Sequence, residues 1–119
     1  MTLQDFIKYL LPEDLAYYFE PIEIKEHGGQ LTICLDERNN IPEELKDKDL
    51  ESKGFYPALT LEDFPIRDRK VYLSVRRRKW IDKSDGKIYS RTWDLKSAGT
   101  SYTKEFGAFL KGIIGYPSS

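Results

Sequence analysis

The residues best suited to chemistry lie in a basic and aromatic stretch in the second half of the chain. Four cations follow one another at positions 76–79 and end on Trp80. A guanidinium group offers parallel donors to a phosphate, and an aromatic ring can stack on a nucleobase. The stretch therefore predicts binding to an anionic partner that carries bases, which is a nucleic acid. The candidate DNA-binding residues are Arg76, Arg77, Arg78, Lys79, Trp80, Lys83, Lys87, Tyr89, Arg91 and Trp93.

A β-hairpin is expected to position these residues. Residues 82–86 form a turn signal whose strongest element is Asp85-Gly86, and strand-like segments flank it at 71–80 and 88–95. A two-stranded ribbon of this kind fits the major groove of B-DNA. The alternative is a solvated basic face whose tryptophans pack in the core. If even positions pair with odd ones, periodicity gathers Arg76, Arg78, Trp80, Tyr89, Arg91 and Trp93 on one face, with Lys83 and Lys87 at the tip.

The charges along the chain are strongly segregated, although the net charge is only −1. Residues 1–65 carry fifteen acidic and six basic side chains, whereas residues 66–96 carry eleven basic and four acidic ones. Such polarity within one small chain suggests an anionic partner for the basic half.

The remaining chemically capable residues predict neither catalysis nor a cofactor. His27 and Cys34 are single residues of their kind, so the chain cannot build a zinc site of the usual four ligands, and no metal is expected. The many carboxylates of residues 36–53 lack apolar neighbours in sequence that would shift their pKa values, so this segment is interpreted as a solvated connector. No apolar run approaches the ~20 residues of a membrane span, which favours a cytoplasmic protein with no membrane partner.

Helices are expected at both ends of the chain. An apolar stripe at i, i+3, i+4 spacing predicts a helix over 2–11, and Pro12 opens a second short helix that ends at Pro21. A further stripe predicts a C-terminal helix over 100–114, which its two glycines weaken.

A first β-hairpin is expected between residues 22 and 35, because alternating segments flank the glycine pair 28–29. Its predicted register places Ile24 opposite Ile33 and Ile22 opposite Leu35. Residues 55–66 are expected to form an extended edge segment interrupted by proline.

Length and pattern together predict one α+β domain over 1–119, with two β-hairpins, two short N-terminal helices and a C-terminal helix. Residues 1–53 would hold the two helices, the first hairpin and the acidic connector. Residues 54–114 would hold the basic hairpin and the last helix. The two hairpins are expected to join in one small sheet.

Residues 63–67 (DFPIR) and 70–80 (KVYLSVRRRKW) resemble the N-terminal region of bacterial insertion-sequence transposases of the DDE type. In the family that begins with a zinc ribbon, such a strand leads into a cysteine knuckle. Here residues 82–87 keep the turn and lack both cysteines, as do residues 52–56. The resemblance implies an accessory protein that binds transposon-end DNA without catalysis, since the catalytic carboxylates of that family lie in a later domain. The chain is therefore not expected to be an enzyme.

Two alternatives remain open at the level of sequence. The chain could be a protein-interaction module that docks on a separately encoded catalytic transposase chain through the apolar stripes of its terminal helices. It could also be a degenerate remnant with neither activity.

Overall fold

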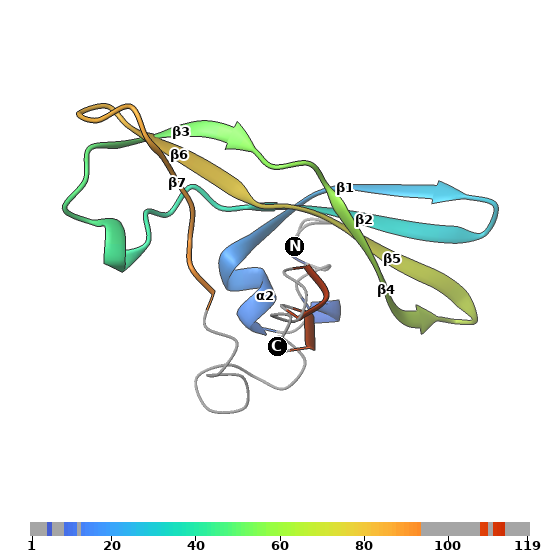
Figure 1. The fold of residues 1–119 in the computed structure, drawn as a ribbon. Coiled ribbons are helices and arrows are strands. Elements are labelled where there is room, and N and C mark those ends of the chain that lie inside the picture. The colour runs from blue at the N-terminus through green and yellow to red at the C-terminus, as the bar shows by residue number, and fades with distance from the viewer. Residues whose placement is uncertain (1–4, 6–8, 12, 94–107, 110, 114–119) are drawn as a thin grey trace, which may run out of the picture.

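The computed structural model describes residues 5, 9–11, 13–93, 108–109 and 111–113. Their strands form two sheets, one of four strands in the order β1-β2-β5-β4 and one of three in the order β3-β6-β7 (Figure 1). Strands and helices are both present, which is compatible with the α+β class expected from the sequence. The elements are α2 (Glu13–Tyr18), β1 (Phe19–His27), β2 (Gln30–Glu37), the 3-10 helix η1 (Glu43–Leu45), β3 (Leu50–Phe55), β4 (Leu59–Ile66), β5 (Arg69–Arg76), β6 (Arg78–Asp82) and β7 (Ile88–Tyr89).

The helices differ in part from the prediction. The second predicted helix is present as α2, but it ends at Tyr18 and not at Pro21, because β1 begins at Phe19 and buries that ring completely. Residue 5 and residues 9–10 are helical, and most of the helix predicted over 2–11 lies outside the described residues. The same holds for the helix predicted over 100–114, of which residues 108–109 and 111–113 are described as helical.

The first predicted hairpin is confirmed as β1 and β2, which are antiparallel. Gly28 and Gly29 form its two-residue loop with φ angles of 57° and 81°, as a tight turn of this hand requires. Ile24 pairs with Ile33 as predicted. The predicted partner of Leu35 is wrong, because a β-bulge between Pro21 and Glu23 inserts one residue and places Pro21 opposite Leu35.

The expectation that the two hairpins share one sheet is wrong. β2 pairs in parallel with β5, β4 pairs with β5 in a further hairpin, and the hairpin of β6 and β7 belongs to the other sheet. Parallel pairing requires a long crossover between the two strands, and η1, β3 and β4 provide it. β4 lies at the edge of its sheet, as predicted for the proline-interrupted segment.

The predicted solvated connector over 36–53 is wrong at both ends. β2 continues through Asp36 and Glu37, which are buried, and β3 begins at Leu50. Both carboxylates lie at the end of a central strand, where neighbouring segments cover them. Only the part around η1 matches the expected polar loop, since Glu43 and Glu44 are exposed.

The apolar core lies on one face of the four-stranded sheet. α2 and the helical residues 108–109 and 111–113 lie against this face, and no described helix covers the opposite face (Figure 1). A side chain at Gly112 would approach Leu61 of β4 to 2.9 Å, so the absence of a Cβ atom there allows close packing. Among the described residues, no helix is long and apolar enough to cross a membrane. The buried core residues are Leu11, Leu15, Phe19, Ile33, Leu35, Val71, Leu73, Val75, Trp93, Phe109 and Ile113.

Candidate nucleic-acid interface

The basic run of the predicted hairpin is the segment that passes from one sheet to the other. β5 ends at Arg76, β6 begins at Arg78, and Arg77 lies between the two strands. Arg76 pairs with Asp36 of β2, and Arg78 pairs with Phe55 of β3. The run is therefore paired with other strands and is not the tip of a free ribbon.

The four cations of the run divide between two neighbouring aromatic rings at the end of β3. Arg76 and Arg78 both lie over the ring of Phe55, with 4.2 and 4.5 Å from each guanidinium carbon to the ring centroid. Arg77 and Lys79 contact the ring of Tyr56 at 5.1 and 5.4 Å. Each contact is a cation–π interaction. We call Arg76 and Arg78 the inner pair, and Arg77 and Lys79 the outer pair.

The inner pair is hydrogen-bonded within the molecule, and Arg76 also forms an ion pair. Arg76 donates two hydrogen bonds to the carboxylate of Asp36, at 2.7 and 2.6 Å, and this bidentate contact raises the pKa of Arg76. The guanidinium group of Arg78 donates to the backbone carbonyl of Glu37 and to the hydroxyl of Ser52. These donors are therefore engaged inside the protein and are not available to a phosphate in this conformation.

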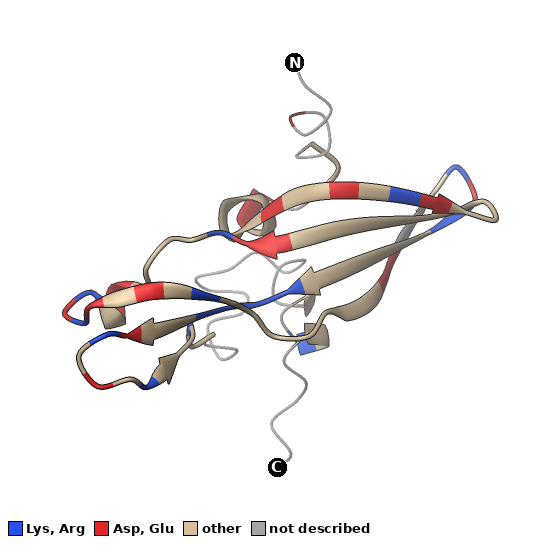
Figure 2. Ribbon diagram, turned by 90° about the horizontal axis from the view of Figure 1, so that it is seen from above, with Lys and Arg blue, Asp and Glu red and all other residues tan. Residues whose placement is uncertain are grey.

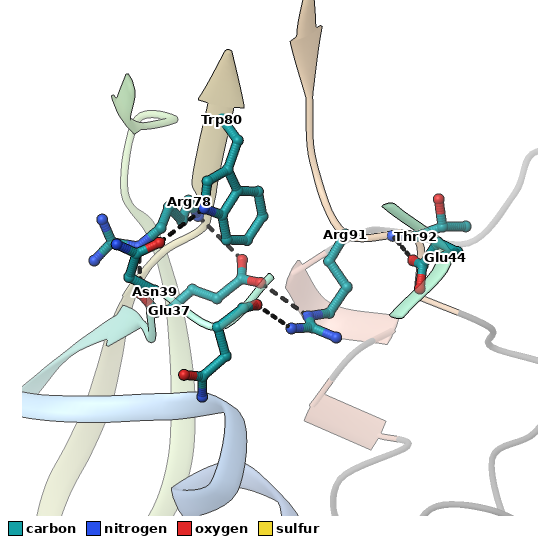
Figure 3. Close-up of polar contacts among 8 residues, drawn as sticks. Glu37, Asn39, Glu44, Arg78, Trp80, Arg91 and Thr92 are labelled. Carbon is teal, nitrogen blue, oxygen red and sulfur yellow. Dashed lines mark hydrogen bonds and ion pairs between the residues drawn. The ribbon is translucent and has the colours of Figure 1, made fainter. Parts of the chain in front are cut away.

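Glu37 joins the two sheets at the end of β2 (Figure 3). Its side chain is 1% exposed and accepts hydrogen bonds from the backbone N–H of Arg78 at 3.0 Å and from Nε of Arg91 at 3.1 Å. Burial raises the pKa of Glu37, and the hydrogen bonds from Arg78 and Arg91 oppose that rise only in part. Arg91 also donates to the backbone carbonyl of Asn40, so its guanidinium group is occupied as well.

Both tryptophans of the predicted interface are buried, and Trp93 belongs to the apolar core. Trp80 is 0% exposed and donates its indole N–H to the side-chain carbonyl of Asn39 at 2.8 Å (Figure 3). Trp93 is 8% exposed and stacks on Phe19, with 5.9 Å between ring centroids. Neither ring is accessible for stacking on a base in this conformation, which agrees with the alternative interpretation of the tryptophans.

The return strand is shorter than predicted. β7 covers only Ile88–Tyr89, and residues 90–93 are irregular, although the pairing of Trp80 with Tyr89 has the even-with-odd register that was expected. The ring of Tyr89 lies under the ammonium group of Lys48 at 4.4 Å. The strand ends early because Arg91 turns towards Glu37 and Trp93 turns into the core.

The turn between β6 and β7 holds the remaining two candidates. Ser84 donates hydrogen bonds from its backbone N–H and its hydroxyl to Asp82, and these bonds lower the pKa of Asp82. Lys83 lies 3.7 Å from Asp49, and both side chains are more than half exposed, so this ion pair contributes little. Lys87 is exposed at the same tip.

Among the described residues, the side chains of the outer pair form no hydrogen bond or ion pair, although the positive charge of Arg77 opposes the rise in the pKa of Glu37. Arg77 and Lys79 are partly exposed, as is Tyr56, and Lys53 lies at an exposed position of β3 on the same side as Glu51. Glu51 pairs with Ile81, so these two side chains lie on the same side of the sheet. Trp80 is the neighbour of Ile81 along β6 and therefore lies on the opposite, buried side. We call Lys53, Tyr56, Arg77 and Lys79 the outer basic face.

Sequence reasoning missed the residues that divide the run. Asp36 and Glu37 directly follow an alternating apolar segment, which favours an extension of the strand through them. They were assigned to the polar connector because they are charged. Phe55 and Tyr56 stand together before a proline and were assigned to an edge segment. Within the described ranges, His, Cys, Asp and Glu side chains form no group of three that could hold a metal ion.

Comparison with known proteins places the chain in no group: no protein-family description, no curated protein and no solved structure matches it.

Proposed function

We propose that this chain binds DNA through the outer basic face, without catalysing a reaction, and that its targets are transposon ends. One observation carries the DNA-binding part: the side chains of Arg77 and Lys79 are partly exposed and form no hydrogen bond or ion pair among the described residues, whereas the side chains of the inner pair are hydrogen-bonded internally. The narrower assignment to transposon ends, as an accessory to a catalytic transposase, is supported by the resemblance of residues 63–80 alone.

The contact with Tyr56 suits the outer pair to phosphate binding. A guanidinium group that stacks on a ring keeps its N–H donors in its own plane, where they can reach a phosphate. The ring also limits the conformations of Arg77 and Lys79, so less side-chain entropy is lost when they bind. The outer basic face is therefore partly preorganised for an anion.

The acidic surface of β1 supports the proposed orientation of the DNA. Glu20, Glu23 and Glu26 are exposed along that strand (Figure 2). Their charges repel phosphate, so DNA would avoid the edge formed by β1.

The docking alternative receives less support. Leu11, Phe109 and Ile113 belong to the predicted apolar stripes of the terminal helices, and all three are buried in the core. A surface for a catalytic transposase chain would have to use other residues of those helices.

The test compares the salt dependence of DNA binding in matched variants. Arg77→Ala/Lys79→Ala should reduce the steepness of log K against log salt by about 2, because each phosphate contact contributes about −0.9 to that slope. Lys46→Ala/Lys70→Ala removes the same charge from exposed positions elsewhere and should leave the slope nearly unchanged. Equal slopes for the two variants, or no salt-dependent affinity in the wild type, would overturn the proposal.

A further inference from the structure

β1 leaves one side of its backbone without a partner strand in the described part of the chain. It is the first strand of the order β1-β2-β5-β4, and it forms the outer edge of the sheet (Figure 1). Two apolar residues are exposed along it, Ile22 at 44% and Ile24 at 37%. An exposed edge with apolar side chains is a template for pairing with another strand.

The hairpin loop determines which backbone groups point out of this edge. His27 and Gln30 close the two-residue loop and form its hydrogen-bonded pair, and hydrogen-bonded pairs alternate with non-hydrogen-bonded pairs along an antiparallel ladder. Ile24 and Glu26 therefore direct their N–H and C=O groups away from β2. The bulge between Pro21 and Glu23 marks the other end of the regular edge.

We propose that β1 pairs antiparallel with β1 of a second copy of this chain, about a two-fold axis at Ile24. In this register Ile24 lies opposite its own symmetry mate, and Glu23 lies opposite Lys25 of the other copy. The Glu23–Lys25 contact occurs twice, because the axis repeats it. Opposite residues of a non-hydrogen-bonded pair have Cα atoms about 4.5 Å apart, which brings these charges together. The two four-stranded sheets become one continuous sheet.

The charges on β1 select this register over its neighbours. A two-fold axis at Glu23 would place that carboxylate against itself, and an axis at Lys25 would do the same with the ammonium group. With the axis at Ile24, Ile22 faces Glu26 and no like charges are opposed. A lysine in the middle of an edge strand normally discourages pairing with other chains, and here Glu23 of a second copy compensates it.

The other edge of the sheet is less suited to pairing. β4 contains Glu62 and Asp63 without a basic residue, and Pro65 removes one backbone donor. A bulge between Asp63 and Ile66 also disturbs its ladder. The proposal is therefore specific to β1, and it is independent of the proposed DNA binding because it uses none of the outer basic face.

Charge reversal at two exposed positions tests the pairing. Glu23→Lys alone and Lys25→Glu alone each oppose like charges twice in the dimer, and each should weaken self-association about tenfold or more in low salt. The double variant Glu23→Lys/Lys25→Glu restores both contacts, and so does an equimolar mixture of the two single variants. Sedimentation velocity over a concentration series measures the association in all four samples and in the wild type.

Amide hydrogen exchange provides a second readout that does not depend on a variant. The N–H groups of Ile24 and Glu26 should gain protection as the wild-type concentration rises, while the amides of β4 do not. A wild type that stays monomeric throughout, single variants that associate as well as the wild type, or a double variant that does not recover would each overturn the proposal. A monomeric wild type that still binds DNA through Arg77 and Lys79 would overturn the pairing and leave the proposed function intact.

Discussion

The inner pair and the outer pair come from one uninterrupted run of cations, yet the two pairs have different surroundings. Arg76 and Arg78 lie over Phe55 and are hydrogen-bonded to Asp36, Ser52 and the backbone of Glu37. Arg77 and Lys79 contact Tyr56, and their side chains form no hydrogen bond or ion pair among the described residues. The alternation of side chains along an extended chain produces this division. A run of like charges in sequence therefore does not form a single patch on the surface.

The comparison also separates two roles for aromatic residues. The inner side of β6 carries Trp80, which is fully buried and hydrogen-bonded to Asn39, whereas Tyr56 on the outer face remains partly exposed. On the inner side, hydrogen bonds to other groups of the protein occupy the donors and stabilise the fold. The outer side keeps its donors available to a ligand. Three experiments test this distinction, beginning with the largest expected effect.

Trp80→Ala should lower the free energy of unfolding by about 3–5 kcal/mol, because it removes a large buried side chain and leaves a cavity. Urea denaturation measures the loss. Ile88→Ala, at a half-exposed position of the same sheet, is the matched control and should cost much less. A Trp80→Ala variant that keeps its stability and loses only DNA affinity would show that the inner side binds the ligand after all.

The pH dependence of stability should change when Glu37 is replaced by Gln. Burial raises the folded-state pKa of Glu37 above its ordinary value of 4.5, so the folded state binds this proton more tightly than the unfolded state does. The stability that protonated Glu37 contributes to the free energy of unfolding is therefore fully present below pH 4.5, and it is lost as the pH rises through the raised pKa.

Unfolding free energies measured from acid to neutral pH test this sign. The stability of the wild type relative to Glu37→Gln should fall with rising pH, by at most about 1.4 kcal/mol per pH unit. If the stability of the wild type relative to Glu37→Gln instead rises with pH, the ion pair with Arg91 stabilises ionised Glu37 by more than burial destabilises it.

Arg77→Ala/Lys79→Ala should change stability least, by about 0.5 kcal/mol or less for each residue, since neither side chain forms a hydrogen bond or ion pair among the described residues. Thermal and urea denaturation of this double variant provide the measurement. A loss of several kcal/mol would make the outer pair structural too, and the distinction between the two sides would disappear.

Local patterns predicted a large part of the fold. The glycine pair fixed the loop of the first hairpin and the register of Ile24 with Ile33, because a two-residue loop leaves little freedom. The alternation of Val71, Leu73 and Val75 correctly indicated a strand with one buried face. The bulge at Pro21 could not be predicted from such patterns, since an extra residue in one strand is defined only by its pairing with the other strand.

Tertiary structure decided the environment of the basic run. The sequence by itself determined that cations and aromatic residues alternate there, because composition and periodicity are local properties. The parallel pairing of β2 with β5 then brought Asp36 opposite Arg76, forty residues away along the chain. Charge neutralisation acts over a few ångströms in space, so only the arrangement of distant strands determines which cations are left for a partner.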